Sequence, residues 1–205
     1  MQADSSLAPS QPTRSIGRIL MALGITFALV LGAWLIGGRQ GFDDLGSGGK
    51  NARMLPRVGE VAPELQAYRI NDSLELVLVS LSDYAGKPIW INFWGSWCQP
   101  CRAEMPDLIE AQKQLEGSGI VMLAISLDEP IEDAYLYAAQ NRANFIILSD
   151  PNRQYVGENY QINNFPTHIF IDASGIVREV QLAPLSVDAA LAAAEKAINP
   201  EVETS

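Results

Sequence analysis

Apolar residues follow two distinct patterns along this chain. The first is an unbroken run over residues 19–38, which holds no charged side chain and is bounded by Arg18 and Arg39. A helix of about 20 residues spans roughly 30 Å, the thickness of the hydrocarbon core of a bilayer. The run therefore predicts a single N-terminal transmembrane helix over residues 19–38.

The second pattern begins at Gly59, where short apolar segments alternate with amphipathic ones. Continuous or alternating apolar segments predict strands, and apolar positions spaced at three and four residues predict helices. We expect strands at 74–81, 88–94, 119–127, 144–149, 167–172 and 176–183, with helices from the cysteine motif to about 115, at 131–141, near 155 and at 187–198. This order predicts an α/β fold, a mixed central sheet with helices on both faces.

The segments around the apolar run differ in composition from the rest. Residues 1–18 are rich in Ser, Pro, Ala and Gln and predict a disordered tail, whereas residues 39–58 contain GSGGKN and predict a flexible linker. Residues 59–205 are numerous enough for one domain with its own core. A cleaved secretory signal is the alternative for the apolar run. Such signals have about 7 to 15 apolar residues, so the longer run favours an uncleaved anchor.

The charge of the chain limits its partners. Lys and Arg number 14 against 24 Asp and Glu, which gives a net charge of −10 at pH 7. Proteins that bind nucleic acid present basic surfaces, so nucleic acid is not expected as a partner. Anionic lipid headgroups would also repel the domain, so contact with the bilayer is expected only through residues 19–38.

Two cysteines, Cys98 and Cys101, are the only ones in the chain and form a C-x-x-C motif. A structural zinc site would need four ligands, and the chain offers a single histidine, His168. A disulfide across so short a loop adds little stability. A redox-active disulfide is the remaining interpretation. It predicts Cys98, at the start of a helix, as the exposed nucleophile and Cys101 as the resolving thiol.

Glu104 is the third predicted catalytic residue. At about 100° per residue it shares a helix face with Cys101 and with apolar residues such as Met105 and Leu108, so it is expected to be buried. A buried carboxyl one turn beyond the resolving cysteine could take a proton from that thiol and return it. Pro106 is expected to bend this helix.

Three segments carry a resemblance to a known family: GKPIWINFWGSWCQPCRAEMPDL, YQINNFPTHIFIDASG and VGEVAPELQAY. Together they resemble the membrane-anchored thioredoxin-like proteins of the TlpA and ResA type. The resemblance implies a thioredoxin fold outside the cytoplasm that reduces disulfides in client proteins such as apocytochrome c. It also implies a membrane thiol transporter as electron donor and a cis peptide bond between Phe165 and Pro166. No cofactor and no metal are expected.

Client contacts are expected from the residues that flank the cysteines and the cis-proline: Trp97, Gln99, Pro100, Phe165, Pro166 and Thr167. Gln99 and Pro100 carry no charge that would stabilise a thiolate, which predicts a reducing pair. Asn92 occupies the place of a buried Asp in ordinary thioredoxins. Because an amide cannot take a proton, Glu104 becomes the nearest candidate base.

Two other functions stay open. A copper-handling protein could use Cys98, Cys101 and His168 as ligands for Cu(I). A thiol peroxidase is the other alternative, although such enzymes use a cysteine in a different loop and this chain has no third cysteine.

Overall fold

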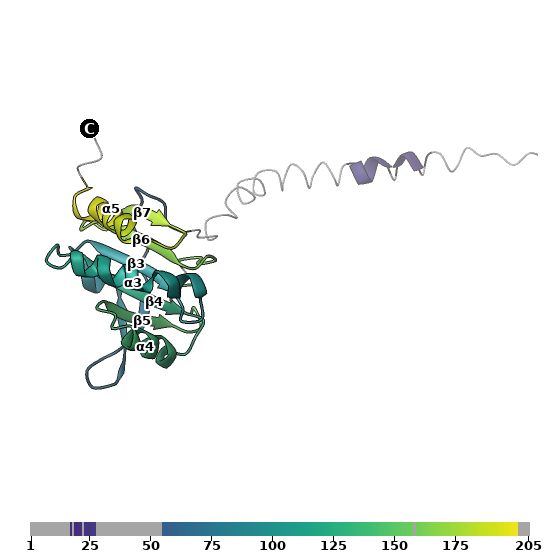
Figure 1. Cartoon of the computed structure of the whole chain (residues 1–205). Helices are drawn as coiled ribbons and strands as arrows, with labels where there is room; N and C mark the ends of the chain where they lie inside the picture. The colour runs from purple at the N-terminus through teal and green to yellow at the C-terminus, as the bar shows by residue number, and fades with distance from the viewer. Residues whose placement is uncertain (1–16, 18, 22, 28–54, 158, 201–205) are drawn as a thin grey trace, which may run out of the picture. The chain divides into compact units, whose positions relative to one another are not determined.

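The structure is a computed structural model that describes residues 17, 19–21, 23–27, 55–157 and 159–200 (Figure 1). Residues 53–205 form one compact unit, separate from residues 1–52. Residues 17, 19–21 and 23–27 are helical. Apart from residue 17, the predicted tail over 1–18 lies outside the described residues, as do residues 39–54 of the linker and residues 22 and 28–38 of the predicted anchor. Within the described ranges, no helix has the length and apolarity needed to cross a bilayer.

A mixed sheet forms the centre of the compact unit (Figure 1). Its strands lie in the order β2-β1-β5-β4-β3-β6-β7. Strand β4 pairs in parallel with β3 and with β5. Strand β1 pairs antiparallel with β2 and β5, and strand β6 pairs antiparallel with β3 and β7. The strands span Gln66–Ile70 (β1), Leu76–Ser80 (β2), Ile89–Trp94 (β3), Val121–Leu127 (β4), Ile146–Asp150 (β5), Thr167–Ile171 (β6) and Val177–Gln181 (β7). The predicted mixed sheet is confirmed.

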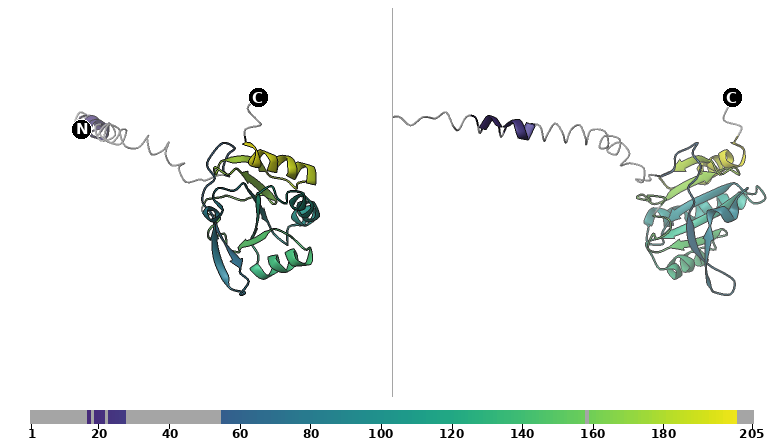
Figure 2. Two further views of the ribbon diagram at one scale, coloured as in Figure 1. Left: turned by 90° about the vertical axis from the view of Figure 1, so that its left-hand side faces the viewer. Right: turned by 180° about the vertical axis from the view of Figure 1, so that it is seen from behind.

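The three α-helices of this unit lie on one face of the sheet, as the left view of Figure 2 shows: α3 (Gln99–Gln114), α4 (Ile131–Gln140) and α5 (Val187–Ile198). The units β3-α3-β4 and β4-α4-β5 step along the sheet in the same direction. Because parallel crossovers are right-handed, both helices must fall on the same side. Leu108 of α3 and four alanines of α5 share one core cluster with Trp90 and Phe170, and Met105 shares another with Ala134 and Ala138 of α4.

The opposite face of the sheet is covered by the short 3-10 helix η1 (Leu81–Tyr84) and by the irregular segment 151–165, which contributes Val156, Tyr160 and Ile162 to the core. The sequence predicted helices on both faces of the sheet. On this face, η1 is the only helix among the described residues. The helix predicted near Tyr155 is wrong, because residues 151–157 form turns. The Asp150 carboxylate accepts the backbone N–H groups of residues 154–156, which binds them to a side chain instead of a helical carbonyl.

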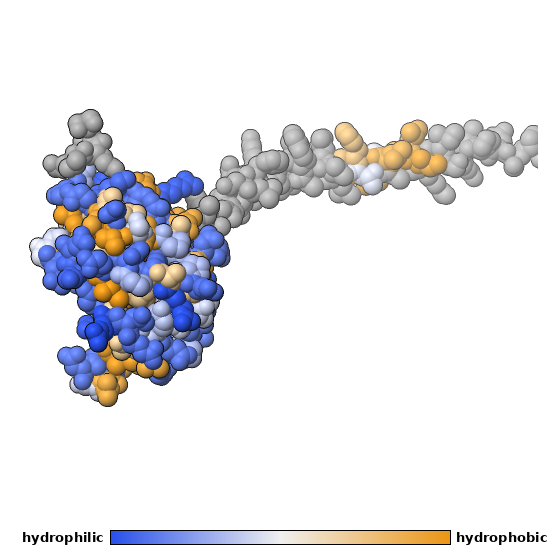
Figure 3. Space-filling view, in the orientation of Figure 1, coloured by the Kyte–Doolittle hydropathy of each residue, from blue (hydrophilic) through white to orange (hydrophobic). Residues whose placement is uncertain are grey.

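Strand β1 was not predicted from the sequence. Its residues Gln66–Ile70 include Gln, Tyr and Arg, and they show no clear apolar alternation. Strand β3 was expected as a continuous apolar segment, and all six of its residues are buried. Ile89, Ile91 and Phe93 belong to the core on the η1 side, whereas Trp90 and Trp94 pack toward the α-helices. The outer surface seen in Figure 3 is mainly hydrophilic with scattered apolar patches.

Candidate active site

The cysteine pair sits at the start of α3. Cys98 is the N-cap residue of this helix, and its sulfur accepts a hydrogen bond from the backbone N–H of Cys101 at 3.3 Å. The two residues form a disulfide with Cα atoms 5.3 Å apart. The free N–H groups and positive dipole end of a helix favour a thiolate at this position once the disulfide is reduced.

Both sulfur-bearing residues are buried, which corrects the expectation of an exposed Cys98. Cys98 is 4% exposed and Cys101 1%. They pack with Trp94 and Met105 and against half-buried Phe165, so the cap of the helix is enclosed by core residues. The neighbours Gln99 and Pro100 are exposed, and their contact with clients stays a prediction.

The loop before the cysteines is held by a buried carboxylate, Glu129. This residue accepts the Ser96 backbone N–H at 2.9 Å and also binds the hydroxyl groups of Ser96 and Ser126. The Trp97 indole N–H donates to the carbonyl of Leu127 at 3.1 Å. The end of β4 therefore positions the residues that lead into the redox pair. Sequence reasoning missed Glu129. The signal available was an acidic residue directly after an apolar strand.

The cis-proline loop lies beside this segment. The Phe165–Pro166 bond is cis, as the resemblance implied. The Phe165 ring meets exposed Trp97 and also lies under the guanidinium of Arg153, 5.4 Å from the ring centroid. Pro166 and Thr167 are buried, and the Thr167 hydroxyl donates to the carbonyl of Asn164. Client contact by Pro166 and Thr167 stays a prediction.

Arg153 links the cis-proline loop to the end of β4. Its guanidinium donates two hydrogen bonds to the Asp128 carboxylate and one to the carbonyl of Ile162. The hydrogen bond to Asp128 raises the pKa of Arg153 above its ordinary value. Sequence reasoning did not identify this pair, because the two residues are far apart in the chain and no motif connects them.

Glu104 is buried on the inner face of α3, as predicted. Its Oε2 accepts the backbone N–H of Leu185 at 2.9 Å and lies 3.2 Å from Nε2 of His168. Its Oε1 has no hydrogen-bond partner among the described residues. A buried carboxyl with one free oxygen, three residues past Cys101, is suited to proton exchange.

Two further polar residues lie on the same side of the sheet. Asn92 is fully buried, and neither polar atom of its side chain has a partner within the described structure. His168 pairs with Asn92 in register on the neighbouring strand. Both ring nitrogens of His168 are engaged, by Trp90 and by Glu104. This engagement disfavours the copper alternative, which needs a free imidazole nitrogen.

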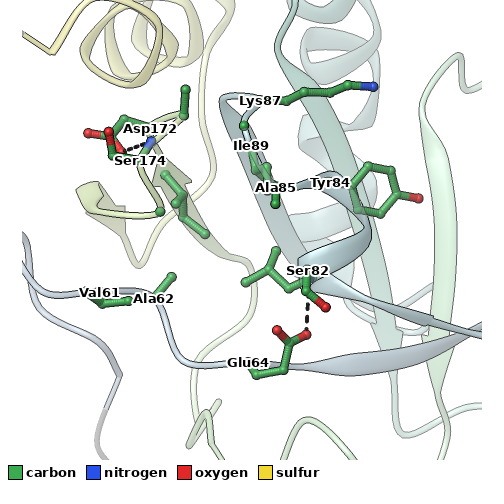
Figure 4. A pocket seen from close by; sticks show the side chains of 15 residues that line it. Val61, Ala62, Glu64, Ser82, Tyr84, Ala85, Lys87, Ile89, Asp172 and Ser174 are labelled. Carbon is green, nitrogen blue, oxygen red and sulfur yellow. Dashed lines mark hydrogen bonds between the residues drawn. The ribbon is translucent and has the colours of Figure 1, made fainter.

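Two of the hollows in the described structure lie near β3 or the loop that follows it. One, of about 250 Å³, borders the redox loop and is lined by Ser96, Arg102, Asp133, Leu136, Tyr137 and Gln140. The other, of about 190 Å³, is shown in Figure 4 and is lined in part by Glu64, Ser82, Lys87 and Asp172. Because Ile89 begins β3 and Cys98 follows its end, the second cavity lies at the opposite end of the strand from the cysteines.

Comparison with known proteins agrees with this geometry. A model of the AhpC/TSA family matches residues 58–180. The thiol-disulfide oxidoreductase ResA of Oceanobacillus iheyensis is 33% identical over 141 residues, which cover 68% of this chain and 72% of that protein. ResA of Bacillus subtilis is 30% identical over 102 residues, which cover 50% of this chain and 56% of that protein.

Solved structures show the same fold. The thioredoxin domain of a thiol-disulfide oxidoreductase from Bacteroides vulgatus has a TM-score of 0.59 at 26% identity, covering 70% of this chain and 99% of that one. A thiol:disulfide interchange protein from Bacteroides sp. has a TM-score of 0.57 at 27% identity, covering 72% and 93%. The chain therefore belongs to the AhpC/TSA family and is a thiol-disulfide oxidoreductase of the ResA type.

Proposed function

We propose that this oxidoreductase is a reductase of protein disulfides outside the cytoplasm, tethered to the membrane through residues 19–38. Its proposed clients include apocytochrome c, whose haem-attachment cysteines must be reduced before haem is joined to them. A membrane thiol transporter is the proposed electron donor. The uncharged apolar run and the similarity to ResA proteins support this proposal.

The direction of electron flow rests on the surroundings of the cysteine pair. Strongly oxidising pairs have a thiolate stabilised by a nearby cation, which makes their reduced form stable. Here Gln99 and Pro100 are uncharged. Arg102, the first cation after the pair, lies over the Tyr137 ring at 5.4 Å. The absence of a charged residue between the two cysteines is the observation that favours a reducing role.

The proposed reaction has two exchange steps. The Cys98 thiolate attacks one sulfur of the client disulfide, forms a mixed disulfide and releases the other client sulfur as a thiolate. Cys101 then loses its proton, and its thiolate attacks Cys98 Sγ, which releases the second client sulfur. Two electrons pass to the client, and the enzyme is left with the Cys98–Cys101 disulfide seen in the structure.

Glu104 is proposed as the group that accepts the Cys101 proton. Two features support this role: the carboxyl is buried one helical turn beyond Cys101, and Oε1 is free of hydrogen bonds among the described residues. The proton then passes from Glu104 to the departing client thiolate, so that the carboxylate is restored for the next cycle.

Trapping in membranes tests the proposed clients and location. Cys101→Ser should attack clients and stall as mixed disulfides, whereas Cys98→Ser should form none. Trapped clients should include proteins with the C-x-x-C-H haem-attachment motif. Protease added after removal of the cell wall or outer membrane should digest residues 59–205. Capture of cytoplasmic proteins alone, or complete protection from protease, would contradict the proposal.

A further inference from the structure

The two oxygens of the Glu104 carboxyl are in different environments. Oε2 is within hydrogen-bond distance of two nitrogens, the backbone N–H of Leu185 at 2.9 Å and Nε2 of His168 at 3.2 Å. Oε1 has no partner within the described residues. An oxygen that already accepts two hydrogen bonds is a poor site for a proton, because its in-plane lone pairs are occupied. A proton taken up by this carboxyl therefore binds Oε1.

The protonation of His168 is set by Trp90. The indole N–H can only donate, and it lies 3.3 Å from Nδ1 of His168. Nδ1 must therefore carry a lone pair, because a proton there would face the indole hydrogen. In the neutral ring the remaining hydrogen is on Nε2 and is donated to Glu104. Trp90 and His168 are both fully buried, with 0% of either residue exposed.

We propose that His168 is a positioning residue, a neutral donor fixed in the Nε2–H tautomer, that directs proton exchange between Cys101 and Glu104 to Oε1. The inference rests on the proposed role of Glu104. A neutral donor can bind Oε2 whether the carboxyl is charged or protonated. A cation in the same place would instead favour the carboxylate and oppose proton uptake.

The proposal implies the following proton path. The Cys101 thiol gives its proton to Oε1 and becomes the thiolate that attacks Cys98 Sγ. The S–S bond between Cys98 and the client breaks, and its electron pair leaves with the client sulfur. Oε1 then returns the proton to that sulfur, while Oε2 keeps its hydrogen bonds to His168 and Leu185 throughout.

Nitrogen NMR of the imidazole tests the tautomer without any substitution. His168 is the only histidine of the chain, so the full-length protein labelled with ¹⁵N-histidine and purified in detergent gives one pair of ring signals. At neutral pH the expected spectrum shows a protonated Nε2 and an unprotonated Nδ1. A protonated Nδ1, in either the other tautomer or the imidazolium, would overturn the inference.

Variants test the positioning role. His168→Leu removes the donor and should slow resolution of the mixed disulfide roughly 10- to 100-fold, the range expected for loss of a hydrogen bond to a carboxylate. His168→Gln, whose amide can donate from a similar position, should stay within a few-fold of wild type. If Glu104→Gln is slow but His168→Leu resolves at the wild-type rate, the inference fails and the role of Glu104 stands. If Glu104→Gln also resolves at the wild-type rate, the proposed function of Glu104 fails. Should His168→Leu not fold, the NMR result decides.

Discussion

The rings of Trp97 and Phe165 meet edge to face, with their centroids 5.1 Å apart. The contact joins the loop before the cysteine pair to the cis-proline loop, two segments that are far apart in the sequence. Trp97 remains 52% exposed, so it presents an aromatic surface directly beside Cys98. Exposed aromatic side chains often provide much of the binding energy at protein interfaces. We expect this surface to bind clients.

Replacement of Trp97 tests the client surface. Trp97→Ala should lower kcat/KM for a protein disulfide about tenfold or more, because a central aromatic contact is lost. The rate with a small-molecule disulfide should be nearly unchanged. Trp97→Phe is the matched control, since it keeps an apolar ring and loses only the hydrogen bond to Leu127. Equal losses with both substrates would instead mean that the reactivity of Cys98 had changed.

The Glu129 carboxylate should be needed to hold the redox loop. Glu129→Gln replaces one carboxylate oxygen by an NH2 group, which cannot accept the hydrogen bonds that Ser96 and Ser126 donate to the carboxylate. We expect the free energy of unfolding to fall by about 1 to 3 kcal/mol, the usual cost of disturbing buried hydrogen bonds to a charged group. Glu132→Gln, at an exposed site in α4, is the control. Equal denaturation midpoints for both variants would contradict this role.

Several features of the fold and site were accessible from the sequence because they rest on local patterns. Strand β3 and helix α3 follow from a continuous apolar segment and from a helical face that includes Glu104. The helix near Tyr155 was wrong because the Asp150 side chain binds the backbone N–H groups of that segment. Such competition depends on how the chain folds locally and leaves no trace in apolar periodicity.

Long-range contacts in the site could not be predicted. Asp128 with Arg153, and Glu129 with Ser96, join residues that are widely separated in the chain. The burial of Cys98 also depends on packing against other elements. His168 was considered as a metal ligand, and only the structure shows that Trp90 and Glu104 occupy its two nitrogens.

Asp172 should make the stability of the fold depend on pH. Burial alone would raise the pKa of this carboxyl, but the backbone N–H groups of Ile176 and Ser174 and the guanidinium of Arg178 outweigh it, and the pKa is lowered. A lowered pKa in the folded state means that the carboxylate stabilises the fold above its unfolded pKa, near 3.8, and that this contribution is lost as pH falls through the folded value.

Asp172→Asn should therefore lower the free energy of unfolding by about 1 to 3 kcal/mol at neutral pH. The difference from wild type should shrink below about pH 4, where the wild-type carboxyl becomes protonated. Denaturant titrations across this range provide the measurement, with Asp72→Asn in the exposed β1–β2 turn as control. A difference that stays constant with pH would mean that the ionised carboxylate does not contribute.

The redox potential should be closer to that of thioredoxin than to that of strong oxidants, because Gln99 and Pro100 provide no cation for the thiolate. Equilibration with glutathione should leave the pair oxidised over most practical buffer ratios. Gln99→His, which places a titratable cation beside Cys98, should shift the potential toward more oxidising values. A wild-type potential as high as that of the strongly oxidising proteins would contradict the reducing role.

The most direct test of the account is the rate at which Cys101 resolves the mixed disulfide. In rapid-quench experiments in which the reduced enzyme reacts with the disulfide form of a client analogue, Glu104→Gln should form the mixed disulfide as wild type does and then resolve it about 10² to 10⁴ times more slowly, because a positioned acid or base contributes about that much. Its folded structure should be retained, since the amide is nearly the same shape as the carboxyl. Resolution at the wild-type rate from about pH 6 to pH 9 would show that solvent, and not Glu104, takes the proton of Cys101.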